Sequence, residues 1–202
     1  KKKAIILSIK GYKLSKNEKI LFSKYRPWGL ILFKRNIKSI AQISKLTKQI
    51  RKLVNDQKFP ILIDEEGSSV SRVQKIMKHN FSQKVLGDIY KINEKIGARY
   101  YKDYIDSLSK FLKKIGVNIN TVPVLDVLRK NSHKIIGSRS FSKKPVNVLK
   151  LGKICIDLYN KNKIATVIKH LPGHGLSKSD SHYKTPIINS NRKVLIKKDF
   201  IP

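Results

Sequence analysis

The sequence of 202 residues contains only one cysteine, one methionine and one tryptophan. Cys155 has no second cysteine to pair with inside the chain, and such sparse cysteine usage is typical of a reducing compartment. No apolar run approaches the ~20 residues that a membrane helix needs. The apolar run at 4–9 follows three lysines but is too short for a signal peptide, so it indicates a strand. We expect a cytoplasmic protein with no membrane span.

Acidic residues are scarce, with 13 Asp and Glu against 45 Lys and Arg, which gives a formal net charge of +32. A charge of this size would ordinarily favour a polyanionic partner. However, only 8 of the basic residues are arginine, the side chain best suited to phosphate and base recognition, and the lysines are spread along the whole chain. The charge therefore predicts solvated lysine-rich faces and no nucleic-acid partner.

Glycine-rich phosphate turns are also missing, because Gly173 and Gly175 form only an isolated Gly-His-Gly. Five aliphatic and β-branched segments are predicted as buried strands: 4–9, 29–35, 60–66, 117–127 and 164–170. Three amphipathic helices are predicted between them: 40–54 after the N-cap Ser39, 92–115 ended by Gly116, and 146–162. Strands that alternate with helices predict an α/β fold with a mostly parallel sheet.

The helical periodicity also predicts which side chains face the core. The helix over 92–115 is expected to turn inward one stripe: Ile92, Ile96, Tyr100, Tyr104, Leu108, Leu112 and Ile115. The helix over 146–162 is expected to turn inward Leu149, Ile154 and Leu158.

Polar residues gather where the predicted strands end. These residues are Arg35, Asn36, Asp64, Glu65, Glu66, Asp126, Lys169 and His170. Functional groups at the carboxyl ends of several strands are typical of a TIM (β/α)8 barrel. Because only five strands are used by residue 170, we expect an incomplete barrel with about five of its eight βα units. Residues 1–202 are then one domain, truncated at the C-terminal side.

The segment 169-KHLPGHGLSKSDSH-182 holds three of the five histidines. Pro172 and Gly173 prevent His170 and His174 from sharing a helix face, which leaves a metal site in a loop as an open alternative. Asp180 and His182 are two residues apart, a spacing that lets a carboxylate orient an imidazole for proton transfer near neutral pH. A solvent-exposed turn is the alternative for this pair.

The whole pattern resembles that of glycoside hydrolase family 3, and in particular its bacterial β-N-acetylhexosaminidase branch. The signature run is KHLPGHG, followed after four residues by Asp-Ser-His. Other segments match in the same order: 28-WGLILFKRN, 63-IDEEG with Arg72, 116-GVNINTVPVLDV and 136-IGSRSF.

The resemblance implies a barrel enzyme that removes terminal N-acetylglucosamine with retention of configuration. Its substrate would be a peptidoglycan-derived muropeptide or a chitooligosaccharide, bound by a monomer with no metal or organic cofactor. His182 would act as the acid and then the base, and Asp180 would orient it. The resemblance places sugar-binding roles on Asp64, Arg72, Arg139, Lys169 and His170.

The sequence also departs from the family pattern. It has 66-EGSSVSR-72 where Glu-Gly-Gly-Arg-Val-Gln-Arg is common, and Leu171 where an aromatic residue is usual. The family's nucleophilic aspartate follows the Asp-Ser-His loop on a later strand. Here only Asp199 follows, in a segment that matches one leading into a helix, so we expect residues 1–202 alone to lack turnover.

Two residues near the predicted site are left outside it. We expect Asp126 to stabilise its own loop and His174 to shape the Pro-Gly loop. Two alternative functions stay open: a phosphorolytic relative of the hydrolases, and a non-catalytic lysine-rich binding protein on a degenerate barrel.

Overall fold

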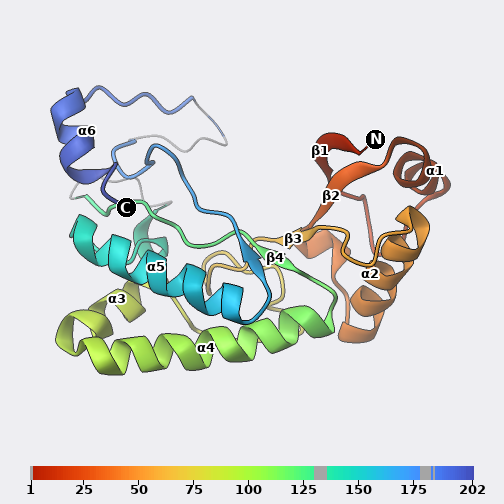
Figure 1. The fold of residues 1–202 in the computed structure, drawn as a ribbon, viewed down its shortest axis with the longest axis horizontal. Helices are drawn as coiled ribbons and strands as arrows, with labels where there is room; N and C mark the ends of the chain where they lie inside the picture. Colours follow the sequence, from red (N-terminus) through yellow and green to blue (C-terminus); the bar gives the residue numbers. More distant parts are fainter. Residues whose placement is uncertain (1, 130–135, 178–182, 184) are drawn as a thin grey trace.

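A computed structural model describes residues 2–129, 136–177, 183 and 185–202. Its five strands form one parallel sheet in chain order (Figure 1). They are β1 (Lys3–Leu7), β2 (Pro27–Leu32), β3 (Ile61–Ile63), β4 (Ile119–Asn120) and β5 (Ala165–Thr166). Every neighbouring pair is parallel, which confirms the predicted α/β class. β4 and β5 are shorter than the predicted segments 117–127 and 164–170, since only two residues of each pair in the sheet.

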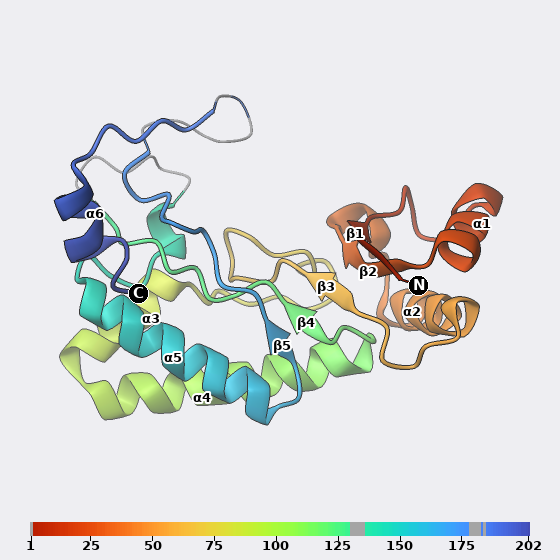
Figure 2. The ribbon, with the colours of Figure 1, turned by 45° about the horizontal axis from the view of Figure 1, so that its top comes forward.

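Helices alternate with the strands as the sequence predicts. They are α1 (Lys16–Tyr25), α2 (Ile40–Val54), α3 (Gln83–Ile92), α4 (Glu94–Lys114), α5 (Pro145–Lys161) and α6 (Arg192–Lys198), with 3-10 turns η1 (Lys34–Asn36) and η2 (Gly137–Arg139). Figure 2 shows β3, β4 and β5 side by side above α4 and α5. In both views α1 and α2 accompany β1 and β2 at the other end of the molecule. No helix in the described ranges is long and apolar enough to cross a membrane.

Side-chain caps explain where several helices begin. Ser39 accepts a hydrogen bond from the backbone N–H of Gln42 and starts α2, as predicted. Ser15 and Glu18 form a reciprocal capping box at the start of α1. The sequence did not predict α1, because Phe22 is its one buried residue and its apolar periodicity is weak.

The helix predicted over 92–115 is confirmed as α4, except that α4 begins at Glu94 and Ile92 is the last residue of α3, a helix that was not predicted. Asn93 is extended, and it both ends α3 and caps α4, so Ile92 is 87% exposed rather than inward. The buried stripe of α4 is Gly97, Tyr101, Ile105, Leu108, Ser109 and Leu112. The predicted inward positions Ile96 and Tyr100 were therefore wrong. The contact with α3 sets the rotation, because a Cβ on Gly97 would lie 2.7 Å from the Cα of Tyr90.

Two further burial predictions need correction. In α5 the fully buried side chains include Val148, Leu151, Cys155 and Tyr159, whereas Leu149 is exposed. The strand β1 was expected to be buried, but Ile5 and Ile6 are exposed. Their exposure follows from the position of β1 at the end of the sheet.

Among the residues that the structure describes, the sheet is open at both ends. β1 and β5 are its terminal strands, and exposed apolar side chains lie at each: Ile5 and Ile6 at β1, Val167 and Ile168 just after β5. Closure of a barrel would give β1 and β5 a second neighbour each. The open sheet is therefore consistent with the predicted incomplete barrel.

Candidate active site

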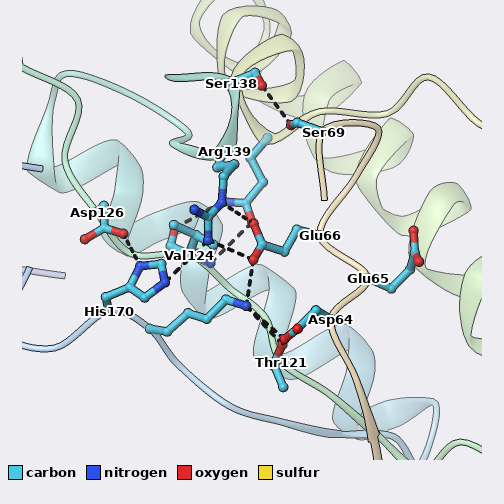
Figure 3. Close-up of polar contacts among 12 residues, drawn as sticks. Asp64, Glu65, Glu66, Ser69, Thr121, Val124, Asp126, Ser138, Arg139 and His170 are labelled. Carbon is cyan, nitrogen blue, oxygen red and sulfur yellow. Dashed lines mark hydrogen bonds and ion pairs between the residues drawn. The ribbon is translucent and has the colours of Figure 1, made fainter. Parts of the chain in front are cut away.

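Charged and polar side chains that follow three strands meet at the carboxyl edge of the sheet. Asp64 directly follows β3, Thr121 follows β4, and Lys169 lies beyond β5. Figure 3 shows Asp64 and Thr121 together with Glu66, Arg139 and His170. The topology explains the meeting, because parallel strands end at the same edge and bring residues distant in sequence together.

Glu66 anchors the cations of this cluster. Arg139 binds it in a bidentate manner, with Nε 2.6 Å from Oε2 and Nη2 3.0 Å from Oε1. Lys169 Nζ lies 2.6 Å from Glu66 Oε1 and 3.0 Å from Thr121 Oγ1. Sequence reasoning did not include Glu66 in the site. The signal was present, because residues two apart in an extended segment point to the same side and Asp64 was already a candidate.

Asp64 is a second carboxylate beside the ammonium group of Lys169, which also contacts Glu66. Its Oδ1 accepts a 2.5 Å hydrogen bond from Thr121 and lies 3.4 Å from Lys169 Nζ, and its Oδ2 accepts from Arg72 Nη2 at 2.9 Å. Burial raises the pKa of Asp64, but Lys169, Thr121 and Arg72 together outweigh burial and leave that pKa below its ordinary value. Asp64 is therefore an ionised acceptor near neutral pH.

Asp126 was expected to stabilise its own loop, but its side chain contacts the loop that carries His170 and His174. Its buried Oδ2 is 2.6 Å from Nδ1 of His170, and its Oδ1 accepts from the backbone N–H of His174 at 2.5 Å. Nε2 of His170 lies 3.4 Å from Arg139 Nη2, which can only donate. This arrangement places the His170 proton on Nδ1. The contact between Asp126 and His170 spans 44 positions, so local sequence could not reveal it.

His174 meets the cluster mainly through its backbone. Its ring lies 5.8 Å from that of His170, centroid to centroid, and is nearly perpendicular to it. Within the described ranges, no group of three or more His, Cys, Asp or Glu side chains is arranged to hold a metal ion.

The loop 66-EGSSVSR-72, which has serine at three positions where the family commonly has other residues, has no positive φ at any of these serines. Gly67 has φ of +150°, whereas Ser68 and Ser69 are not in the left-handed region. A Cβ at Gly67 would lie 2.6 Å from the carbonyl oxygen of Phe81. Ser69 Oγ lies 2.9 Å from Ser138 Oγ and so links this loop to η2, the turn that ends with Arg139.

The two predicted proton-transfer residues, Asp180 and His182, lie outside the described residues. Asp199 directly follows the end of α6. Its Oδ2 lies 2.5 Å from Nη2 of Arg129, and its side chain is almost fully buried. Asp199 also packs against the loop that contains Gly173, because a Cβ added to Gly173 would lie 3.2 Å from Asp199 Cβ.

Comparison with known proteins identifies the family. Residues 2–202 match the sequence model described as the Glycosyl hydrolase family 3 N terminal domain. The chain belongs to this family. It is 31% identical over 198 residues to a Beta-hexosaminidase of Nitrosomonas eutropha, covering 98% of this chain and 56% of that protein. A Beta-hexosaminidase of Hydrogenovibrio crunogenus is 33% identical over 174 residues, covering 86% of this chain and 48% of that protein.

Solved structures agree with the family's fold. Native NagZ from Neisseria gonorrhoeae superposes with a TM-score of 0.89 at 27% identity, covering 98% of this chain and 57% of that one. The same protein in complex with N-trifluoroacetyl-D-glucosamine also has a TM-score of 0.89 at 27% identity, covering 97% of this chain and 56% of that one. The chain thus spans about half the length of these relatives, and its five-stranded α/β sheet corresponds to part of their barrel.

Proposed function

We propose that the cluster at the carboxyl edge of the sheet binds a terminal N-acetylglucosamine residue. The observation that carries this proposal is the set of partly exposed charged groups held around one edge: Asp64, Arg72, Arg139, Lys169 and His170. The relatives are named Beta-hexosaminidase, and one homologous structure holds N-trifluoroacetyl-D-glucosamine. Both facts support a sugar of this type as the ligand.

Each member of the cluster has a chemical reason to contact a sugar. Asp64 is an ionised acceptor, and charged acceptors bind hydroxyl groups more strongly than neutral ones. Lys169 and Arg139 keep donors beside the buried Glu66, and these donors suit hydroxyl and acetamido oxygens. Glu66 holds the two cations in place, so they are organised before the sugar arrives.

For the reaction, we propose retaining hydrolysis in two displacements, with His182 and Asp180 as the acid/base pair. In the first, a carboxylate attacks the anomeric carbon while His182 donates a proton to the departing glycosidic oxygen. In the second, His182 removes a proton from water, which attacks the same carbon and releases the carboxylate. The imidazole thus returns to its starting protonation state.

The attacking carboxylate is proposed to come from outside residues 1–202. Asp199, the last acidic residue of the chain, is almost fully buried and its carboxylate is already paired with Arg129. We further propose that residues 1–202 are one domain, the N-terminal part of the barrel. The open sheet ends and the greater length of the relatives support this. The natural substrate is proposed to be a muropeptide or chitooligosaccharide.

The experiment uses an aryl β-N-acetylglucosaminide as the substrate. The 202-residue chain should release no aryl alcohol above background. A chimera that joins it to the part of the Nitrosomonas eutropha relative that it does not match should release the alcohol, and His182→Ala in that chimera should reduce kcat by ~100-fold or more. Turnover by the 202-residue chain, or an active His182→Ala chimera, would contradict the mechanism.

The same assay separates the alternatives. A phosphorolytic relative would form a sugar phosphate when inorganic phosphate is added, whereas a hydrolase forms free N-acetylglucosamine at the same rate with or without phosphate. A non-catalytic lysine-rich binding protein would instead bind polyanions with a steep dependence on salt and would be indifferent to the change at His182.

A further inference from the structure

Glu65 is a fully buried carboxylate that does not belong to the sugar-facing cluster. Its side chain is 0% exposed, although it lies between two residues of the cluster, Asp64 and Glu66. Figure 3 shows Glu65 turned to the opposite side of the chain from both of them. The alternation follows from the extended backbone after β3, in which successive side chains point to opposite sides. A buried carboxylate is unfavourable unless its oxygens are hydrogen-bonded.

The oxygens of Glu65 close the loop that leads to Arg72. Oε2 accepts from the Ser71 hydroxyl at 3.0 Å and from the backbone N–H groups of Arg72 at 2.9 Å and Val73 at 3.2 Å. Oε1 lies 2.9 Å from Nε2 of His79. The carboxylate of Glu65 therefore holds residues 71–73, at the end of the loop, and links them to His79.

His79 fits the role of donor to this carboxylate. Its Nδ1 is buried and has no hydrogen-bond partner in the described part of the chain, and its ring packs edge-on against Tyr104 with the centroids 5.6 Å apart. An unpaired ring nitrogen is better tolerated without a proton than with one, so a neutral His79 carries its proton on Nε2 and donates it to Glu65.

We propose that Glu65 is a positioning residue that sets Arg72 against Asp64. The backbone of Arg72 is held by Glu65, while its guanidinium reaches Asp64 Oδ2 at 2.9 Å. Ser71, which stands where the family commonly has glutamine, supplies the hydroxyl that completes the arrangement. The proposal rests on the proposed function only in treating Arg72 and Asp64 as a sugar-binding pair.

The test is Glu65→Gln in the 202-residue chain. The amide keeps the size of the side chain, but it replaces one of the two acceptor oxygens with an NH2 group. This NH2 group must then face a group that donated a hydrogen bond to Glu65. We expect N-acetylglucosamine to bind about tenfold more weakly, by NMR titration. Because Arg72 helps to lower the pKa of Asp64, we also expect the pKa of Asp64 to rise, measured from its side-chain 13C shift.

Two matched comparisons separate positioning from general stability. Glu94→Gln makes the same chemical change at a side chain that is 60% exposed, and it should alter neither readout. Arg72→Met removes the group that Glu65 is proposed to place, so adding Glu65→Gln to it should change neither the sugar affinity nor the pKa of Asp64 further.

The possible outcomes each bear on the proposal. A folded Glu65→Gln chain with the wild-type pKa of Asp64 would overturn it. If Glu65→Gln does not fold, Ser71→Ala removes a single hydrogen bond to Glu65 and should raise the pKa of Asp64 by a smaller amount; no rise would again overturn it. If the wild-type chain does not bind the sugar, the proposed function fails, while the pKa of Asp64 still tests the role of Glu65.

Discussion

Replacing Asp126 by asparagine tests how the structure holds His170. The buried carboxylate accepts two hydrogen bonds, one from Nδ1 of His170 at 2.6 Å and one from the backbone N–H of His174 at 2.5 Å. Asparagine has one oxygen and one NH2 group, so one of these donors must then face another donor. If the ring gives way, the His170 proton moves to Nε2, which faces the donating Nη2 of Arg139.

The size of the effect follows from these contacts. Losing one hydrogen bond to a charged group and leaving a buried donor unpaired destabilises the fold by about 2–4 kcal/mol. A neutral amide is easier to bury than a carboxylate, which offsets part of this loss. We expect a net decrease of about 1–3 kcal/mol in the free energy of unfolding, together with a change of the His170 tautomer.

Urea denaturation measures the free energy of unfolding, and ring 15N shifts report the His170 tautomer. The control is Asp157→Asn, because Asp157 is 61% exposed and pairs only with Lys153 among the described residues, at 3.2 Å. The control should change stability by less than about 0.5 kcal/mol. If Asp126→Asn behaves like the control and His170 keeps its tautomer, the reasoning about this contact is refuted.

Three further predictions concern other parts of the chain. Gly67→Ala places a Cβ 2.6 Å from the Phe81 carbonyl oxygen at φ of +150°, so it should lower the free energy of unfolding by about 2–4 kcal/mol in urea, whereas Gly11→Ala, with open space around its Cβ, should not. Burial raises the pKa of Cys155 to about 12, so a thiol reagent at pH 8 should label it only after unfolding; rapid labelling of the folded chain would contradict this. The folded-state pKa of Asp64 lies below its unfolded value of 3.8, so its charge stabilises the fold above that pH, and the stability difference between wild type and Asp64→Asn should shrink as pH falls below about 4; a difference that grows would contradict the sign.

The sequence predicted the sheet better than the helix faces. Five aliphatic segments alternating with helices allow few arrangements, and polar residues at their ends indicate a shared edge. Rotation of a helix is harder to predict, because stripes one residue apart look alike when apolar residues are plentiful. In α4 the choice depended on Gly97 packing against Tyr90 of α3, a helix that the sequence had not predicted.

The candidate site was also predicted only in part. The motif supplied Asp64, Arg72, Arg139, Lys169 and His170, and the structure brings all of them to one region. It did not supply the buried carboxylates that hold them, because Glu66 meets Arg139 across 73 positions and Asp126 meets His170 across 44. Such partners are set by the meeting of strands, which no local pattern encodes.

The most direct measurement for the central claim is the binding of N-acetylglucosamine to the 202-residue chain, followed by 1H–15N and side-chain NMR. We predict saturable shifts at Asp64, Lys169 and His170, and affinity lowered at least tenfold by Lys169→Met, which removes the ammonium beside Asp64 and Glu66. Shifts confined to other regions, or an unchanged affinity in a folded Lys169→Met chain, would contradict a sugar site at this edge.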